Sequence, residues 1–196
     1  MNFLAHQHLS FSQKPIMVGN FIADTLKGKS YRRLPTEIQE GVLLHRFIDN
    51  YTDSHPLILQ GRKLLYPHFR KYAGVVQDVF FDHFLAKNWQ EYHESPLKIF
   101  VQLVYDVMAE SEHIFNERAS RTFRFMSQQN WLESYANLSG IDQALSGLSR
   151  RAIYQSNMEN AMPALIEHGE DLEKDFREFY PQLQKESLKH LSKIQG

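Results

Sequence analysis

The chain has 196 residues, 42% of them hydrophobic, and its 22 Lys and Arg against 23 Asp and Glu give a formal net charge of −1. That length and apolar content suit one domain with its own core, and the near-neutral charge argues against nucleic acid as a partner. Because there is no cysteine, disulfides, a thiol nucleophile and a thiolate zinc site are all excluded.

Helical signals run through almost the whole chain, and no segment shows the period-2 alternation with hairpin turns that marks paired strands. We therefore expect an all-α fold, a compact helical domain over residues 1–196. Prolines suggest helix starts, and Gly28 suggests a helix end. The expected helices cover residues 16–27, 36–54, 57–66, a segment after Gly74, 97–110, 111–128, 141–151, 158–168 and 172–190, with Pro163 and Pro181 breaking the last two.

The two parts of the chain differ in pattern. Residues 1–94 hold polar side chains inside apolar helical runs, so we expect a metal-site core there. Residues 95–196 resemble ordinary amphipathic helices, and we expect them to be additional packing helices. Met1–Ser10 has no signal-peptide pattern, and no stretch approaches the roughly 18 apolar residues of a membrane span. We expect a cytoplasmic protein with no membrane partner.

The first segment carries two histidines, His6 and His8. On a helix, residues two apart point to different sides, so both could face one site only in an extended segment. We therefore expect one ligand or catalytic group here, with the choice between the two left open.

The segment Gly19–Asp24 presents one carboxylate on an otherwise apolar run. Asn20 lies one turn before Asp24, where it could orient that carboxylate or contact a substrate. A local cap is the structural explanation for Asp24, but an acidic residue near a helix C-terminus opposes the helix dipole. Asp24 is therefore a candidate site residue.

His45 and Asp49 lie four residues apart in an apolar run, which places both on one face of the helix expected over residues 36–54. A buried His–Asp hydrogen bond would explain this pair without any function.

The helix after Gly74 repeats the pattern with Asp78, Asp82 and His83. Ionised carboxylates on one buried face repel each other and need a cation. Taken with the His–Asp pair, they favour a divalent metal site. Without cysteine its ligands are His, Asp and Glu, which suit Mn, Mg or Fe at least as well as Zn.

Basic residues gather between Leu26 and Lys71, where nine Lys or Arg stand against four Asp or Glu. A basic rim beside a metal site suits a phosphorylated or acidic macromolecular substrate, although solvated charge explains each residue singly. The candidates for substrate contact are Asn20, Lys27, Arg32, Arg33 and Arg62.

Five ordered motifs in the chain resemble those of the acyl carrier protein phosphodiesterase family. They are Met1–His6, Gly19–Asp24, Gly41–Asp49, Thr52–Pro56 and Asp78–Leu85. The family is regarded as a divergent, helical branch of the HD-type metal-dependent phosphohydrolases. This chain has Asp82-His83 where ordinary HD enzymes have the order His–Asp.

The resemblance implies removal of the 4′-phosphopantetheine arm from holo acyl carrier protein, an acidic protein substrate, with a divalent cation, preferably manganese. The implied ligands are Asp24, His45, Asp49, Asp78 and Asp82. The implied proton donors or ligand-supporting groups are His6, His8 and His83. The cation expected to meet the phosphoryl charge is Arg46 or Lys27. The carrier protein would dock against the basic residues in 29–33 and 62–71.

Two other functions remain open. An HD-type phosphohydrolase acting on a nucleotide or another small phosphoester would share the metal site but would not dock a carrier protein. A non-catalytic helical binding protein would satisfy its buried carboxylates with internal Arg or Lys. Activity on small phosphodiesters alone favours the first, and full stability in chelator without bound metal favours the second.

Overall fold

The computed structural model describes all 196 residues. They form ten α-helices with short connections and no β-strand, which confirms the expected all-α class. The helices are α1 (Phe3–His8), α2 (Lys14–Ile22), α3 (Thr36–Ser54), α4 (Pro56–Phe69), α5 (Ala73–Lys87), α6 (Leu97–Glu110), α7 (Glu117–Gln128), α8 (Trp131–Ser134), α9 (Leu138–Arg151) and α10 (Met162–Gln195). Single turns of 3₁₀ helix lie between them at Ala23–Thr25, Ser30–Arg33, Arg70–Tyr72, Trp89–Glu91, Glu112–Ile114 and Met158–Asn160.

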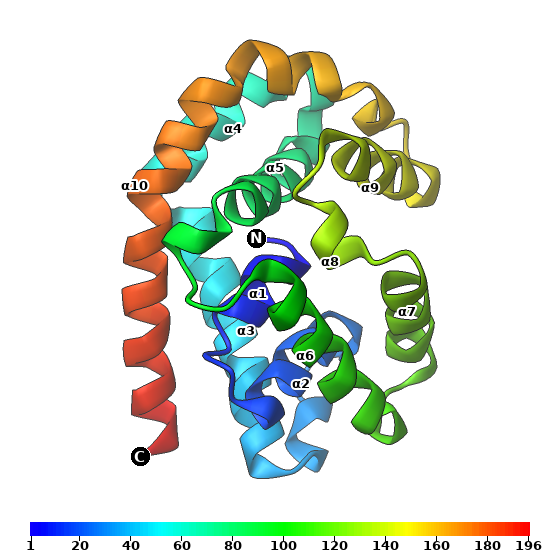
Figure 1. Cartoon of the computed structure of the whole chain (residues 1–196), viewed down its shortest axis with the longest axis vertical. Coiled ribbons are helices and arrows are strands. Elements are labelled where there is room, and N and C mark those ends of the chain that lie inside the picture. Colours follow the sequence, from blue (N-terminus) through cyan, green and yellow to red (C-terminus); the bar gives the residue numbers. More distant parts are fainter.

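Helix α5 is the central element of the fold and packs against α1, α4, α9 and α10 (Figure 1). Apart from Val75 near its start, its apolar residues are buried on all sides. Phe81 meets Phe176 of α10 edge-on, with 5.3 Å between the ring centroids, and burial of each such ring stabilises the fold by about 1.5–3 kcal/mol. Because α5 is buried all round, its polar side chains Asp82 and His83 must find partners inside the protein.

Helices α2 and α3 touch backbone to backbone at two glycines. A Cβ atom on Gly19 would lie 2.1 Å from the carbonyl oxygen of Ile38 and 2.9 Å from the Cα of Gly41, so only glycine permits this approach. The crossing brings Asn20, which follows Gly19, against the face of α3 that carries His45, one turn after Gly41. This local packing builds the centre of the site described below.

Several helix boundaries differ from those expected. Helix α2 ends at Ile22 and a 3₁₀ turn follows, so Asp24 lies beyond the helix. Helix α4 continues through Pro67 to Phe69. Helix α7 begins only at Glu117, after another 3₁₀ turn.

Helix α10 is the largest departure, because it is one helix where two were expected. Pro163 lies in its first turn, where a missing N–H costs nothing. Pro181 lies inside the helix, which costs about 3 kcal/mol in an isolated helix. Phe179, Tyr180 and Leu183 around it are completely buried, and this packing offsets the cost. Figure 1 shows α10 as a long bent helix along one side of the molecule.

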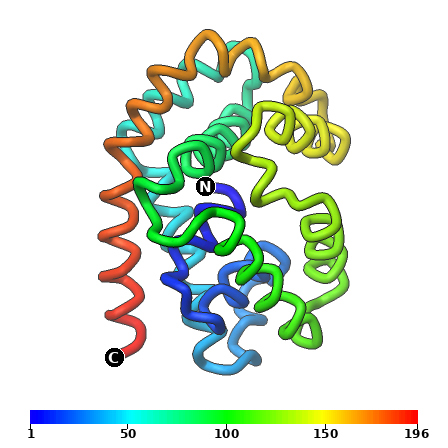
Figure 2. Tube along the Cα trace, viewed as in Figure 1, coloured from blue at the N-terminus to red at the C-terminus, as the bar shows by residue number.

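One hydrophobic core runs from Met1 to Leu191, so both expected parts of the chain share it. The beginning of the chain lies in the middle of the molecule, whereas the other end lies at the tip of α10 (Figure 2). Met1 is itself buried. None of the helices combines the length and the apolar character needed to cross a lipid bilayer.

Candidate metal centre

His6 of α1 meets His45 and Asp49 of α3, and their ligand atoms all lie within 4.8 Å of one another. Oδ1 of Asp49 lies 3.2 Å from Nε2 of His6, and its Oδ2 lies 3.1 Å from Nε2 of His45. Asp24 reaches the cluster from the turn after α2, with 3.2 Å between its Oδ1 and Nε2 of His45. Atoms that share one divalent ion lie about 3 Å apart, since each lies about 2.1 Å from the metal. The spacing therefore suits a metal ion.

The cluster has a buried side and an open side. The His6 and His45 rings are buried and stacked, with 4.2 Å between their centroids. The side chains of Asp49 and Asp24 are 42% and 68% exposed. A substrate can therefore approach the carboxylate side of the cluster, while the imidazoles are held from behind.

Asn20 fixes the tautomer of both histidines. Its Nδ2 donates to the His6 carbonyl oxygen at 2.8 Å and to Oγ of Ser10 at 3.1 Å, so its Oδ1 must face the two rings. Nδ1 of His6 and Nδ1 of His45 lie 2.8 Å and 2.9 Å from that oxygen. A carbonyl oxygen only accepts hydrogen bonds, so both rings donate from Nδ1.

This arrangement leaves a lone pair on each Nε2 of the neutral rings, and those lone pairs face the oxygens of Asp49 and Asp24. Two electron-rich atoms in contact need a cation between them. Protonation of both rings would stack two positive charges, which repel each other. A divalent cation bound to the Nε2 atoms of His6 and His45 satisfies every group at once, because metal-bound histidines characteristically donate their other ring N–H to a fixed acceptor. The residues present therefore fit a divalent metal.

The electrostatics of the metal-free site agree. Burial, and then the charge of His45, lower the pKa of His6. Burial also acts to lower the pKa of His45, but hydrogen bonds to Asp24 and Asp49 outweigh it and raise that pKa to about 9. Burial would raise the pKa of Asp49, but the hydrogen bonds and charges of both histidines lower it below its usual range. At neutral pH one proton therefore sits on His45, at the place a metal would take.

Replacing Asn20 with leucine should weaken manganese binding by about 10–100-fold, because it removes the acceptor that holds both imidazoles with Nε2 free for the metal. Isothermal titration of metal-free protein with Mn²⁺ measures this affinity. Asn50→Leu is the matched control, since Asn50 is an exposed residue of α3 whose side chain forms no hydrogen bond. Equal affinities in the two variants would show that Asn20 does not position the ligands.

Asp82 lies elsewhere, on the buried face of α5, and is saturated by backbone donors. Its Oδ2 accepts the N–H of Leu4 at 2.7 Å, and its Oδ1 accepts two more at 3.3 Å, from Asn2 and Ala5. Burial raises the pKa of Asp82 to about 7, although these donors act to lower it. Asp82 thus caps the start of α1. Its partners are backbone groups, and the metal expected there is not needed.

Asp78 is also held by a partner other than a metal. The amino group of Met1 lies 3.0 Å from its Oδ1. The cation that the paired carboxylates of α5 require is therefore an ammonium group in this structure. Neither Asp78 nor Asp82 belongs to the cluster of His6, His45 and Asp49.

His8 and His83 point away from the cluster. His8 donates from Nε2 to the Tyr92 carbonyl oxygen at 3.1 Å and accepts the Tyr180 hydroxyl at Nδ1, 2.7 Å away. Burial lowers the pKa of His8 to about 4, so it stays neutral and has no free nitrogen. His83 donates from Nδ1 to the carbonyl oxygen of Tyr135 at 2.7 Å. Of the two histidines in the first segment, only His6 reaches the cluster.

The basic candidates fall into two groups. Arg46 donates to the Gly28 carbonyl oxygen at 2.8 Å and lies over the ring of Tyr31, and Arg62 is paired with Asp53 at 2.8 Å. These two arginines are held by the protein itself. The other candidates are exposed and form no ion pair: Lys27, Arg32 and Arg33.

Two features of the site were missed by the sequence analysis, because they depend on tertiary contacts. A small cavity of about 30 Å³ touches His6, Asp24 and His45, and it is also lined by Asn2 and Phe3. The double acceptor role of Asn20 depends on the glycine crossing of α2 and α3. The glycine four residues before His45 is the one clue in the chain, because glycine within a helix often marks close backbone approach.

Comparison with known proteins identifies the relatives of this chain. Residues 1–183 match the family described as "Acyl carrier protein phosphodiesterase". A protein of that name from Photorhabdus laumondii is 31% identical over 92% of this chain and 92% of its own length. Proteins of the same name from an Enterobacter species and from Yersinia pestis are each 30% identical, over 93% and 95% of this chain and 95% and 97% of their own lengths. No solved structure matches the chain.

Proposed function

Because the chain belongs to the acyl carrier protein phosphodiesterase family, we propose that it is a metal-dependent phosphodiesterase that removes 4′-phosphopantetheine from holo acyl carrier protein. The observation that carries the proposal is the pair of histidine Nε2 atoms that Asn20 directs at the carboxylates. This arrangement needs a cation, and phosphodiester hydrolysis is a reaction that a divalent cation accelerates.

The proposed ligands are His6, His45 and Asp49, with Asp24 as a fourth or as the residue that orients water. The sequence left His6 open as a ligand, a proton donor or a group that supports a ligand, and we now propose it as a ligand. We leave Asp78 and Asp82 out, because their contacts are with Met1 and the backbone of α1. Two histidines and a carboxylate leave open positions on the ion and suit manganese or iron. We propose manganese, with magnesium as the weaker candidate because imidazole suits it less.

A divalent ion held there would polarise the phosphoryl oxygens and bring the pKa of water toward about 7. In the hydrolysis, the water oxygen bonds to phosphorus, the bond from phosphorus to the serine oxygen breaks, and that oxygen takes up a proton. The products are the free serine of the carrier protein and 4′-phosphopantetheine. Exposed Asp24 would accept a hydrogen bond from the attacking water. In the metal-free site the hydrogen bond from His45 lowers the pKa of Asp24, and the charge of a bound cation would keep it ionised in the loaded enzyme.

The carrier protein is acidic, so it would meet the exposed cations Lys27, Arg32 and Arg33, which follow Asp24 directly in the chain. Attraction between exposed charges is screened by salt. We therefore propose this segment as the docking surface, without Arg62, which is paired with Asp53. We give Arg46 no role toward the phosphoryl charge, because it is held at the Gly28 carbonyl oxygen.

Incubation of metal-stripped protein with holo acyl carrier protein tests the function. Mass spectrometry should show loss of the phosphopantetheine arm with added Mn²⁺ and no loss without it. Hydrolysis of a small phosphodiester with no change in the carrier protein would replace this function by that of an HD-type phosphohydrolase on small phosphoesters. No hydrolysis of either would overturn the enzyme assignment.

Manganese affinity should rise with pH. The pKa of metal-free His45 is raised to about 9, so below that pH each ion must displace one proton. The apparent affinity should therefore fall about tenfold per pH unit between about pH 8 and about pH 6. Titration calorimetry in buffers of different ionisation enthalpy measures the proton released. An affinity that is flat over this range would show that His45 is not a ligand.

A further inference from the structure

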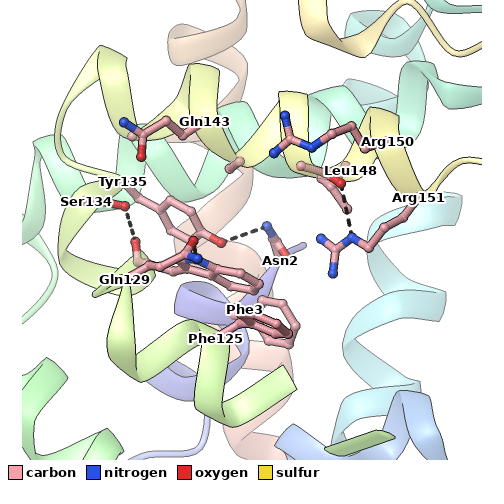
Figure 3. Close-up of a pocket in the computed structure, with 14 residues that line it drawn as sticks. Asn2, Phe3, Phe125, Gln129, Ser134, Tyr135, Gln143, Leu148, Arg150 and Arg151 are labelled. Carbon is pink, nitrogen blue, oxygen red and sulfur yellow. Dashed lines mark hydrogen bonds between the residues drawn. The ribbon is translucent and has the colours of Figure 1, made fainter. Parts of the chain in front are cut away.

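A second and larger cavity, of about 260 Å³, lies between the start of α1 and helices α7, α8 and α9 (Figure 3). The metal centre does not use it. Figure 3 draws the side chains that line this cavity, among them Phe3, Phe125 and Arg151. Its residues come from the start of the chain and from residues 125–151, so the fold assembles it from parts that no local motif connects.

The cavity shares part of its wall with the small cavity at the metal centre. Asn2 and Phe3 line both this cavity and the small cavity that touches His6 and His45. The Asn2 side chain also donates to the hydroxyl of Tyr135, at 3.4 Å, which ties this shared wall to α8 and its end. A chain attached to a phosphate at the metal centre would cross Asn2 and Phe3, which separate the two cavities, to enter the larger one.

The lining alternates between apolar and amide side chains. Phe3, Trp131 and Leu148 supply apolar surface, together with Phe125 on α7, which is 48% exposed. The hydrogen-bonding side chains are Asn2, Gln129, Ser134 and Gln143. Apolar surface combined with placed hydrogen-bonding groups is typical of a site for a small organic ligand, and this pocket carries more polar groups than most.

The lining of the cavity carries positive charge and no negative charge. No carboxylate and no lysine lines it, and the two charged residues are Arg150 and Arg151, both exposed. Pantetheine is a slender, uncharged chain in which two amides are separated by short alkyl links, and it ends in a thiol. The amide side chains match the amides of this arm, and the two arginines would face the acidic protein that carries it.

We propose that this cavity holds the pantetheine arm while the phosphodiester lies at the metal centre. The inference rests on the proposed function, since it names where the substrate of that function is bound. It also assigns a role to α7, α8 and α9, which the sequence indicated only as packing helices.

The test replaces a glycine in the wall of the cavity with a large side chain that fills the cavity. A Cβ atom on Gly147 of α9 would meet only the Arg150 guanidinium, at 3.9 Å, so a side chain can begin there without a backbone clash. Gly147→Phe should therefore fold and occupy the space. Gly169→Phe is the matched control, because a Cβ on this α10 glycine would meet only Leu165, at 3.6 Å. Ala144→Met, in the same wall of the cavity, is the second variant if Gly147→Phe does not fold.

Calorimetry of the manganese-loaded proteins compares the affinity for 4′-phosphopantetheine with the affinity for inorganic phosphate. The difference is the contribution of the arm to binding. The wild type and Gly169→Phe should bind 4′-phosphopantetheine at least about tenfold more tightly than phosphate, a difference of about 1.4 kcal/mol. Gly147→Phe should lose this difference, raise the KM for holo carrier protein by a similar factor, and keep its affinity for Mn²⁺.

The outcomes separate the inference from the function. Cleavage of the carrier protein with no change in Gly147→Phe would overturn the arm site and keep the function. The wild type could prefer 4′-phosphopantetheine to phosphate, with Gly147→Phe losing that preference, and still cleave no carrier protein. That result would keep the arm site and overturn the function. Tighter binding of adenosine monophosphate than of 4′-phosphopantetheine would assign the cavity to a nucleotide and overturn the inference.

Discussion

Replacing Asp49 with asparagine is expected to lower manganese-dependent cleavage of the carrier protein by at least about a thousandfold. Asp49 is the one carboxylate in contact with both histidines, through Oδ1 to His6 and Oδ2 to His45. The amide keeps the size of the side chain but removes its charge, so two neutral imidazoles would hold the ion with one strong ligand fewer. Single-turnover cleavage of holo carrier protein, followed by mass, measures the rate.

The matched control is Asp53→Asn, one turn further along α3. Asp53 is exposed and pairs with Arg62, away from the cluster. It should keep nearly the wild-type rate. Near-normal turnover in Asp49→Asn, with manganese still bound, would remove Asp49 from the ligand set and with it the proposed centre.

Asp82→Asn is expected to act on stability instead, lowering the free energy of unfolding by about 2–3 kcal/mol. Asp82 accepts three backbone N–H groups at the start of α1, and asparagine offers one oxygen where the carboxylate offers two. Its NH₂ group would confront a donor, and a buried N–H would lose its partner. Urea denaturation measures the loss, with Asp142→Asn as an exposed control on α9.

The folded fraction of Asp82→Asn should still bind manganese with nearly the wild-type affinity. A cap and a ligand at this position both predict a loss of activity. Manganese affinity separates the two roles, because only the loss of a ligand should weaken it. A variant of unchanged stability that has lost manganese binding would return Asp82 to the ligand set.

The sequence predicted the parts of the site that depend on local spacing. His45 and Asp49, four residues apart, do lie on one face of α3 and touch. His6 and His8, two apart, do point to different places, so only one of them reaches the cluster. These relations follow from helix geometry alone, which is why they could be read before any tertiary contact was known.

The partners of α5 could not be predicted in the same way. A buried carboxylate is satisfied equally well by a metal, by an ammonium group or by backbone N–H groups. Asp78 and Asp82 use the second and third of these, and their partners come from Met1 to Ala5, which lie far away in the sequence. Spacing within one helix shows that a partner is needed but contains no information about which one the fold supplies.

Tertiary packing also explains why α10 is continuous. Local propensity predicts a helix break at Pro181, and the burial of the side chains around it outweighs that preference. The larger cavity has the same origin, because Phe3 and Arg151 come together only in the folded chain. All-α class, which depends on patterns within each segment, could be predicted from the sequence.

Pulsed electron paramagnetic resonance of the manganese-loaded protein, with ¹⁵N-labelled histidine, tests the metal centre most directly. We expect coupling of Mn²⁺ to the ring nitrogens of two histidines, reduced to one in His6→Ala and in His45→Ala, and unchanged in His8→Ala and His83→Ala. Absence of histidine coupling, or its loss in His83→Ala, would place the ion among the carboxylates of α5 and contradict the centre proposed here.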